Sequence, residues 1–251
     1  AVYGNGGADA VPVTITGTMA NMSANDVTAL NLITAGTTGT VTGTLDGNAA
    51  QLKNITTGAY TITVDDAPNT ADGATITEAT SVATVAFAGG INDSAANLFQ
   101  TGNYTNLDKV VGKDADVAIV INDAADDTVI ATTLSGIGGK TTGAVTTTNT
   151  LNTSGTLAQV EAAAVTTATK ITLGAATVTV TPAVDGDATN IPILNNISGA
   201  TTGVVTATLN SAAVAVLTHA TTGVSTKSAD LITMTVSDTV TVAQGADLAG
   251  K

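Results

Sequence analysis

The chain has no cysteine, no arginine and no tryptophan, and aromatic residues make up only 2% of its 251 residues. The absence of cysteine excludes disulfides and thiolate metal sites, so packing and hydrogen bonds must hold the fold together. Because aromatic side chains are scarce, the core must consist mainly of Ala, Val, Leu and Ile, which supply most of the 43% hydrophobic fraction. That fraction is enough to bury a core in a chain of this length, and we therefore expect a folded protein.

Charged residues are also scarce, at 11% of the chain, and the balance is acidic. Seven lysines face twenty acidic residues, which gives a net charge of −13. Nucleic-acid binding requires basic side chains that displace counterions, and an anionic membrane repels an acidic surface. No apolar run approaches the roughly 18 residues of a membrane-spanning helix. The composition therefore predicts neither a nucleic-acid partner nor a transmembrane segment. The start at Ala1, without a leader sequence, is typical of a processed protein or of a segment of a longer one.

What the chain does contain is an internal repeat. The tripeptide Thr-Thr-Gly occurs at residues 37–39, 56–58, 141–143, 201–203 and 221–223. Longer segments match as well, because residues 30–45 and 194–209 are identical at ten of sixteen positions. The spacing of the tripeptides indicates a duplicated unit of about 20 residues with insertions.

Stretches in which apolar residues alternate with Thr predict strands whose outer face carries Thr. They lie at residues 40–45, 60–64, 176–181, 204–209 and 232–236. The continuous apolar run at residues 117–121 predicts a strand covered on both faces. Segments rich in Ala and Leu predict helices of one to three turns, at residues 48–55, 94–100 and 156–165. Thr156 followed by Gln159 forms a capping-box pattern, and the glycine of each Thr-Thr-Gly is expected to ease the turn before a strand.

These patterns together predict a mainly β fold. The first interpretation is a repetitive β-solenoid-like chain with short helical crossovers. The alternative is a set of tandem antiparallel β-sandwiches, since pairs of hairpin strands also recur at about 20 residues. In either case we expect strand content to exceed helix content at least about twofold. Residues 1–142 are expected to form an N-terminal repeat half, residues 143–155 a linker, and residues 156–251 a C-terminal repeat half.

Residues that commonly carry chemistry are few. His219 is the only histidine and Glu78 and Glu161 are the only glutamates, which supports neither a nucleophile triad nor a glycosidase pair. The sequence therefore predicts no enzyme. Aspartates in loops are candidate Ca²⁺ ligands, because Ca²⁺ binds six to eight oxygen atoms; the alternative is that they form turns and supply surface charge. The candidate ligands are Asp185, Asp187, Asn190, Asp123, Asp126 and Asp127.

The pattern Thr-Thr-Gly-x-Val-Thr-x-Thr-Leu, followed by x-x-Ala-Ala-x-Leu, occupies residues 37–52 and, less regularly, residues 201–217. It resembles the Thr/Ala/Gly-rich repeats of giant bacterial surface proteins, namely cyanobacterial-type S-layer-like proteins and repetitive adhesins. The resemblance implies secretion to the cell surface, a scaffold or adhesive role, and use of Ca²⁺.

We therefore expect an extracellular structural protein that self-associates into a homopolymer, filament or lattice through exposed sheet edges. The alternative is an adhesin-type module that recognises a surface glycan, which requires outward Thr side chains aligned on one face. Residues 1–10 lead into the strand-like residues 11–16, where Pro12 suits an edge position. We expect this terminal segment to lie along a neighbouring subunit.

Overall fold

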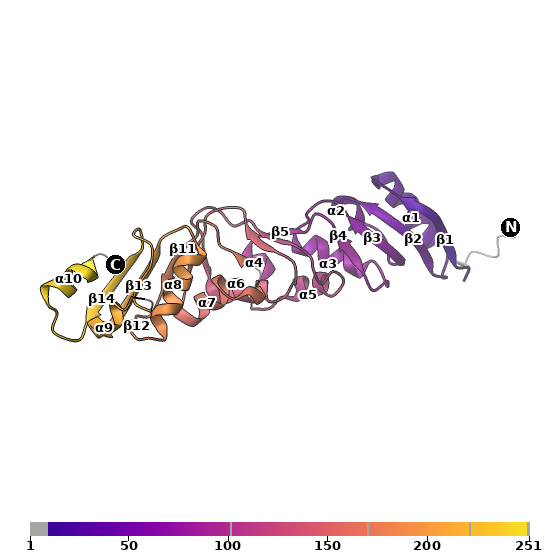
Figure 1. Cartoon of the computed structure of the whole chain (residues 1–251). Helices are drawn as coiled ribbons and strands as arrows, with labels where there is room; N and C mark the ends of the chain where they lie inside the picture. The colour runs from indigo at the N-terminus through magenta and orange to yellow at the C-terminus, as the bar shows by residue number, and fades with distance from the viewer. Residues whose placement is uncertain (1–9, 101, 170, 221, 250–251) are drawn as a thin grey trace. The chain divides into compact units, whose positions relative to one another are not determined.

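Helices and strands alternate along the chain in the computed structural model, which describes residues 10–100, 102–169, 171–220 and 222–249 (Figure 1). The residues divide into two units by their internal contacts. The first contains the described residues up to Val120 together with Lys140–Gly143, and the second contains Ile121–Gly139 and the described residues from Ala144 onward. The expected linker at residues 143–155 includes two short strands.

The first unit contains a parallel sheet in which strands adjacent in the sheet follow one another along the chain. Its strands, in order, are β1 (Val13–Met19), β2 (Val41–Gly47), β3 (Ala59–Val64) and β4 (Val85–Phe87). The helices between them are α1 (Ala24–Ala35), α2 (Ala49–Leu52) and α3 (Thr70–Glu78). The chain continues through β5 (Ile91–Asp93), α4 (Ala95–Leu98), α5 (Thr105–Val111) and β6 (Ile119–Ile121), whose last residue belongs to the second unit.

The second unit repeats this arrangement. Its main parallel sheet contains β7 (Thr128–Ile130), β9 (Asn152–Gly155), β11 (Thr177–Val180), β13 (Val205–Ala212) and β14 (Leu231–Val236), and β12 (Val184–Asp185) also pairs with β13. A smaller parallel pair joins β8 (Val145–Thr147) to β10 (Ile171–Thr172). The helices are α6 (Ala131–Gly138), α7 (Leu157–Ala164), α8 (Asn190–Ala200), α9 (Val214–Leu217) and α10 (Val242–Ala249), with a 3₁₀ turn at Thr167–Thr169.

Local sequence signals explain where several helices begin. The predicted capping box at Thr156 and Gln159 is confirmed at the start of α7. A second capping box, which the sequence analysis missed, starts α1: the Ser23 side chain accepts a hydrogen bond from the Asp26 N–H, and Asp26 accepts one from the Ser23 N–H. Aspartate at this position also stabilises the positive end of the helix dipole.

The core lies between one face of each sheet and the helices. On β3, Tyr60, Ile62 and Val64 are buried, whereas Thr61 between them is exposed. On the helix side, Leu30 of α1, Leu52 of α2 and Ile76 of α3 are fully buried. Small aliphatic side chains therefore fill a thin layer, and Thr covers the open face of the sheet, as the alternating pattern predicts.

The mainly β solenoid and the antiparallel sandwiches are both wrong, because the fold is α/β with parallel sheets and helices between the strands. In the described parts of the chain helices contain more residues than strands, so the expected twofold excess of strand is wrong too. The repeat is also longer than 20 residues: Thr208 pairs with Thr233, 25 residues later, because each unit includes a helix. None of the helices in the described ranges is long and apolar enough to cross a membrane.

The missed helices have weak local signals. In α8, Ile191, Leu194 and Ile197 are buried at helical spacing, yet the segment also contains Gly, Pro and β-branched residues with low helix propensity. Packing against the sheet overrides this propensity, as is usual for short helices that are unstable alone.

Candidate functional site

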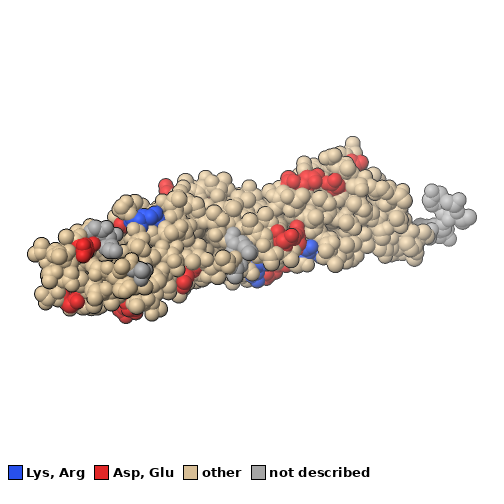
Figure 2. Space-filling view, in the orientation of Figure 1, with Lys and Arg blue, Asp and Glu red and all other residues tan. Residues whose placement is uncertain are grey.

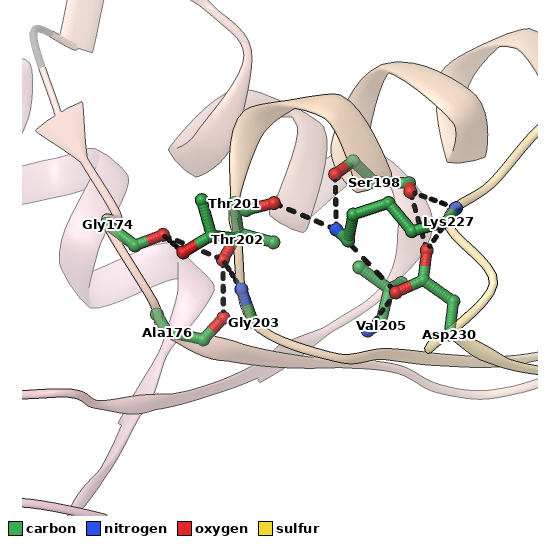
Figure 3. A network of polar contacts seen from close by, with 9 residues as sticks. All are labelled: Gly174, Ala176, Ser198, Thr201, Thr202, Gly203, Val205, Lys227 and Asp230. Carbon is green, nitrogen blue, oxygen red and sulfur yellow. Dashed lines mark hydrogen bonds and ion pairs between the residues drawn. The ribbon is translucent and has the colours of Figure 1, made fainter.

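The most connected polar cluster of the second unit surrounds the turn between α8 and β13, at residues 201–203 (Figure 3). Thr201 is 4% exposed, and its Oγ1 donates a hydrogen bond of 2.6 Å to the carbonyl oxygen of Ala176. The same Oγ1 accepts a 3.0 Å hydrogen bond from the Gly203 N–H. The Thr202 N–H donates to the Gly174 carbonyl oxygen at 2.8 Å. The turn is therefore bound to backbone that precedes it by about 25 residues, and we call this arrangement the clasp.

Glycine in the clasp is required by space. A Cβ atom on Gly203 would lie 2.3 Å from the carbonyl oxygen of Ala176 and 2.4 Å from that of Ala175, closer than real Cβ contacts allow. Its φ is not in the left-handed region. The expectation that glycine eases the dihedral angles of the turn is therefore wrong, because the close approach of two backbones is what excludes a side chain.

Lys227 and Asp230 lie on the other side of this turn (Figure 3). The Lys227 Nζ donates to the carbonyl oxygens of Ser198 at 2.6 Å and Thr201 at 2.8 Å, which places a positive charge at the C-terminal end of α8. The Asp230 side chain is fully buried and lies 3.6 Å from the Lys227 Nζ. It accepts hydrogen bonds from the Val205 N–H at 2.8 Å, the Ser198 Oγ at 2.5 Å and the Lys227 N–H at 3.0 Å.

The clasp recurs three times in the first unit. At residues 37–39, 80–82 and 141–143, the first Thr donates through Oγ1 at 2.6 Å to the carbonyl oxygens of Val11, Tyr60 and Val117, respectively. Each of these hydroxyls also accepts a hydrogen bond from the N–H two residues later. A Cβ on Gly39 or Gly143 would lie 2.4 or 2.2 Å from the preceding backbone. Sequence analysis missed the clasp at residues 80–82, because it reads Thr-Ser-Val.

A lysine completes this missed clasp as well. The Lys113 Nζ donates to the carbonyl oxygens of Thr80, at 3.3 Å, and of Val82. Lys113 and Lys227 therefore play the same part in the two units: each ammonium group binds the backbone of the turn in the strand unit before it. In a chain with seven lysines and no arginine, this use of lysine is structural.

The other two Thr-Thr-Gly tripeptides do not form this clasp within the described residues. The turn at residues 56–58 is bound instead to the Asn31 amide, which donates to the Asn54 carbonyl at 2.9 Å and accepts from the Thr56 N–H at 2.8 Å. Thr221 lies outside the described residues, so the tripeptide at residues 221–223 cannot be compared in full.

Asn195 repeats the role of Asn31 at the matching position of the other long repeat. Its Nδ2 donates to the Gly223 carbonyl oxygen at 2.9 Å, and its Oδ1 accepts from the Ser225 N–H at 2.9 Å. In both cases the amide joins a carbonyl and an N–H that are two residues apart in the next unit. The similarity of residues 30–45 to residues 194–209 thus extends to their hydrogen bonds.

This chemistry is suited to holding backbone segments together. Ser198 is 2% exposed, and its hydroxyl is already bound to Asp230 and to the Lys227 N–H. A nucleophile must reach its substrate, and burial prevents that here. His219 is engaged locally, with its Nδ1 3.0 Å from the Thr222 Oγ1.

The predicted Ca²⁺ ligands lie in two loops of the second unit. In one, the Asp187 Oδ1 accepts hydrogen bonds from the N–H groups of Thr189 and Asn190, and the Asn190 Nδ2 donates to the Asp185 carbonyl. These contacts are those of a turn-forming aspartate.

In the other loop, the Asp127 Oδ2 accepts from the Ala124 N–H at 3.0 Å, and the carbonyl oxygens of Asp123 and Asp126 accept from Asn149 and Asn152, respectively. Over the described ranges, no three His, Asp or Glu side chains gather in a way that could hold a metal ion. Binding of Ca²⁺ by either loop stays a prediction.

A groove of about 470 Å³ lies in the first unit, beside β3, β4 and residues 111–116. Burial raises the pKa of Asp114, and the neighbouring Asp116 carboxyl raises it further, although the Phe87 N–H that Asp114 binds at 2.7 Å lowers it. A second close acidic pair is formed by Asp65 and Asp46, where the hydrogen bond between the two side chains raises the pKa of Asp65. Sequence analysis identified neither pair, because pairing depends on which loops meet.

The face of the molecule in Figure 2 carries few charged side chains, and most of the surface in view has neither Lys nor an acidic residue. Comparison of the chain with protein-family models, with curated proteins and with solved structures finds no match. The argument for function therefore rests on the residues described above.

Proposed function

We propose that the chain is a structural subunit of an extracellular surface layer or filament, and that it has no enzymatic activity. The observation that carries the proposal is the clasp, which is used four times and directs buried hydroxyl groups to the backbone of the preceding strand unit. In a catalytic site, reactive side chains line a space that substrate can enter. Here Ser198 and Asp230 instead serve the packing of one unit on the next.

Two further features support a scaffold role. The surface relies on Thr and Ser hydroxyls more than on charge, and the first and last strands of the main sheets, β1 and β14, contain no charged residue. Proteins that remain monomeric usually protect such edges with charges. The proposed location outside the cell rests on the resemblance of residues 37–52 to the repeats of bacterial surface proteins.

The test is the assembly state of the purified chain. Light scattering over a roughly hundredfold range of protein concentration should show mass that grows with concentration, and negative-stain microscopy should show fibres or sheets of regular width. A chain that remains monomeric over the whole range, with the circular dichroism of a folded protein, would contradict the proposal.

A second function, adhesin-type binding of a glycan, is favoured by the open face of the first sheet. Parallel sheets are normally covered on both faces, whereas this face carries outward Thr side chains in register across neighbouring strands. The aligned residues are Thr14 with Thr42, and Thr18 with Thr44 and Thr61. Rows of hydroxyls at strand spacing could donate to and accept from sugar hydroxyls.

Binding of the monomeric chain to immobilised polysaccharides tests this second function. The double variant Thr44→Val with Thr61→Val should lose binding, because it removes the hydroxyls of one row. The matched control is Thr28→Val with Thr75→Val, which changes two exposed threonines on helices instead. Equal binding by wild type and both variants would rule out the Thr face.

A further inference from the structure

The exposed apolar side chains gather at the first and last strand units. Within the described residues, seven large hydrophobic side chains are exposed. Three of them belong to the β1 and α1 unit (Val11, Leu32 and Ile33), three belong to the β14 and α10 unit (Leu231, Val240 and Val242), and the seventh is Ile130. Exposed apolar side chains that cluster in this way indicate interaction surfaces.

The core layer is also uncovered at these two edges. Val13 and Ile15 on β1 are half-buried, whereas Val41 on the neighbouring strand is buried. Ile232 and Met234 on β14 are likewise half-buried. In the helix layer, α10 has no buried residue and Val242 is 93% exposed.

The free edges of β1 and β14 face opposite ways. We call the edge of a strand that pairs with a strand later in the chain its later edge, and the other its earlier edge. On β13, Thr206 pairs with Thr179 of β11 on one side and with Leu231 of β14 on the other, so successive strands add to the later edge. Among the described residues, β14 has no partner on its later edge and β1 has none on its earlier edge.

We propose that the later edge of β14 in one copy of the chain pairs in parallel with the earlier edge of β1 in a second copy. This inference rests on the proposed scaffold function and names its contact. The pairing has the same sense as every pair within the two main sheets, and α1 of the second copy would meet α10 of the first, so both layers continue. Each contact leaves one β1 edge and one β14 edge free, so the assembly grows from head to tail.

The regular part of β1 sets the register of this pairing. The pairing of β1 with β2 shifts after Thr14, and Gly17 has a φ of 83°, so only the residues before this bulge can form a regular ladder. The strand sequences place Val13 opposite Ile232, Thr14 opposite Thr233, and Ile15 opposite Met234. Apolar residues then face apolar residues and Thr faces Thr, as in the pairing of Val13 with Val41 and Thr14 with Thr42.

Two edge-blocking variants test the contact. Ile15→Lys blocks the β1 edge and Met234→Lys blocks the β14 edge, because each would place an ammonium group in the layer that the second copy covers. Both positions are half-exposed in a single chain, so the lysine stem can lie on the sheet with its charge in water. Each variant alone should stay monomeric at concentrations at least roughly tenfold above those at which wild type assembles.

The mixture of the two variants is the decisive measurement. Each variant keeps one free wild-type edge, so an equimolar mixture should form a dimer and nothing larger, as measured by light scattering. Assembly or dimerisation of either variant alone, or a mixture that remains monomeric, would overturn the head-to-tail contact while wild-type assembly still supports the scaffold function. A monomeric wild type would overturn both.

A second set of variants at exposed positions guards against misfolding. Thr14→Lys with Thr233→Lys opposes two like charges across the proposed contact and should abolish assembly. Thr14→Glu with Thr233→Lys opposes unlike charges and should assemble. The control, Thr61→Lys with Thr179→Lys, adds the same charge at exposed positions of interior strands and should assemble like wild type. Equal assembly of the Lys/Lys and Glu/Lys variants would overturn the register.

Discussion

The Oγ1 of Thr201 lies 2.6 Å from the carbonyl oxygen of Ala176, and this one hydrogen bond joins residues that are 25 positions apart. Because the same hydroxyl also accepts from the Gly203 N–H, it satisfies two backbone groups at once. Buried backbone groups without partners are costly, so the clasp contributes to stability through what would be left unpaired in its absence.

Thr201→Val should therefore lower the free energy of unfolding by about 1–3 kcal/mol, because it removes the hydroxyl and keeps the size of the side chain. The neighbouring Thr202→Val is the control, since Thr202 is exposed, and a change within about 0.5 kcal/mol is expected there. Urea denaturation of both variants measures the difference. Equal losses would mean that the buried hydroxyl has no special role.

Gly203→Ala should destabilise the protein by about 1–3 kcal/mol, because the added methyl would overlap the Ala176 carbonyl oxygen and force the two backbones apart. Gly199→Ala, in α8, is the matched control. No atom lies within 4 Å of its added Cβ, so alanine should stabilise the helix by up to about 0.5–1 kcal/mol. The opposite signs can be read from thermal melting, and a loss of stability in both variants would contradict the spatial argument.

Asp230→Ala should cost at least about 1.5–3 kcal/mol, because it leaves the Val205 N–H and the Ser198 hydroxyl without their charged acceptor. Asp247→Ala, at an exposed position on α10, makes the same change of charge and should be near neutral. Chemical denaturation at neutral pH checks both. A similar effect of the two variants would show that net charge, not the buried carboxylate, is responsible.

Asp114 should make stability depend on pH in the direction opposite to most carboxyls. Its pKa is raised in the folded state by burial and by Asp116, so its favourable contribution is present below the pKa of the unfolded chain and is lost as pH rises through the folded pKa. Asp114→Asn, which is neutral at every pH, should therefore gain stability relative to wild type as pH is raised from about 3 to 7.

The control for this prediction is Asp26→Asn. The Ser23 hydroxyl and N–H lower the pKa of Asp26, so its contribution is present above the unfolded pKa and is lost as pH falls. This variant should lose stability relative to wild type over the same rise in pH. Urea denaturation at both pH values gives the two differences, and changes of the same sign would contradict the assignment.

Part of the fold could be predicted because its signals are local. Alternation of apolar residues with Thr correctly predicted β2, β3, β11, β13 and β14, since a half-buried strand needs only period two. The capping box of α7 was likewise contained in four consecutive residues. The helices α1 and α8 were missed, because their Thr, Ile, Pro and Gly content weakens helix propensity and contact with the sheet compensates for it.

The site was visible in the sequence only as a repeated word. The recurrence of Thr-Thr-Gly marked the clasp, but its acceptors lie in the preceding strand unit, outside any local window. For the same reason sequence analysis could not show that Gly203 is needed because of the Ala176 backbone, or that Lys227 and Asp230 complete the cluster.

The sequence by itself determined a disulfide-free chain with a core of small aliphatic residues, Thr on the outer face of its strands and an internally repeated unit, because composition and short periodicities carry those properties. Only the tertiary structure decided that the strands pair in parallel, that helices fill the connections, and that one hydroxyl in each clasp reaches back to an earlier backbone. Those features depend on which segments meet in space, and burial against a distant partner determines their energies.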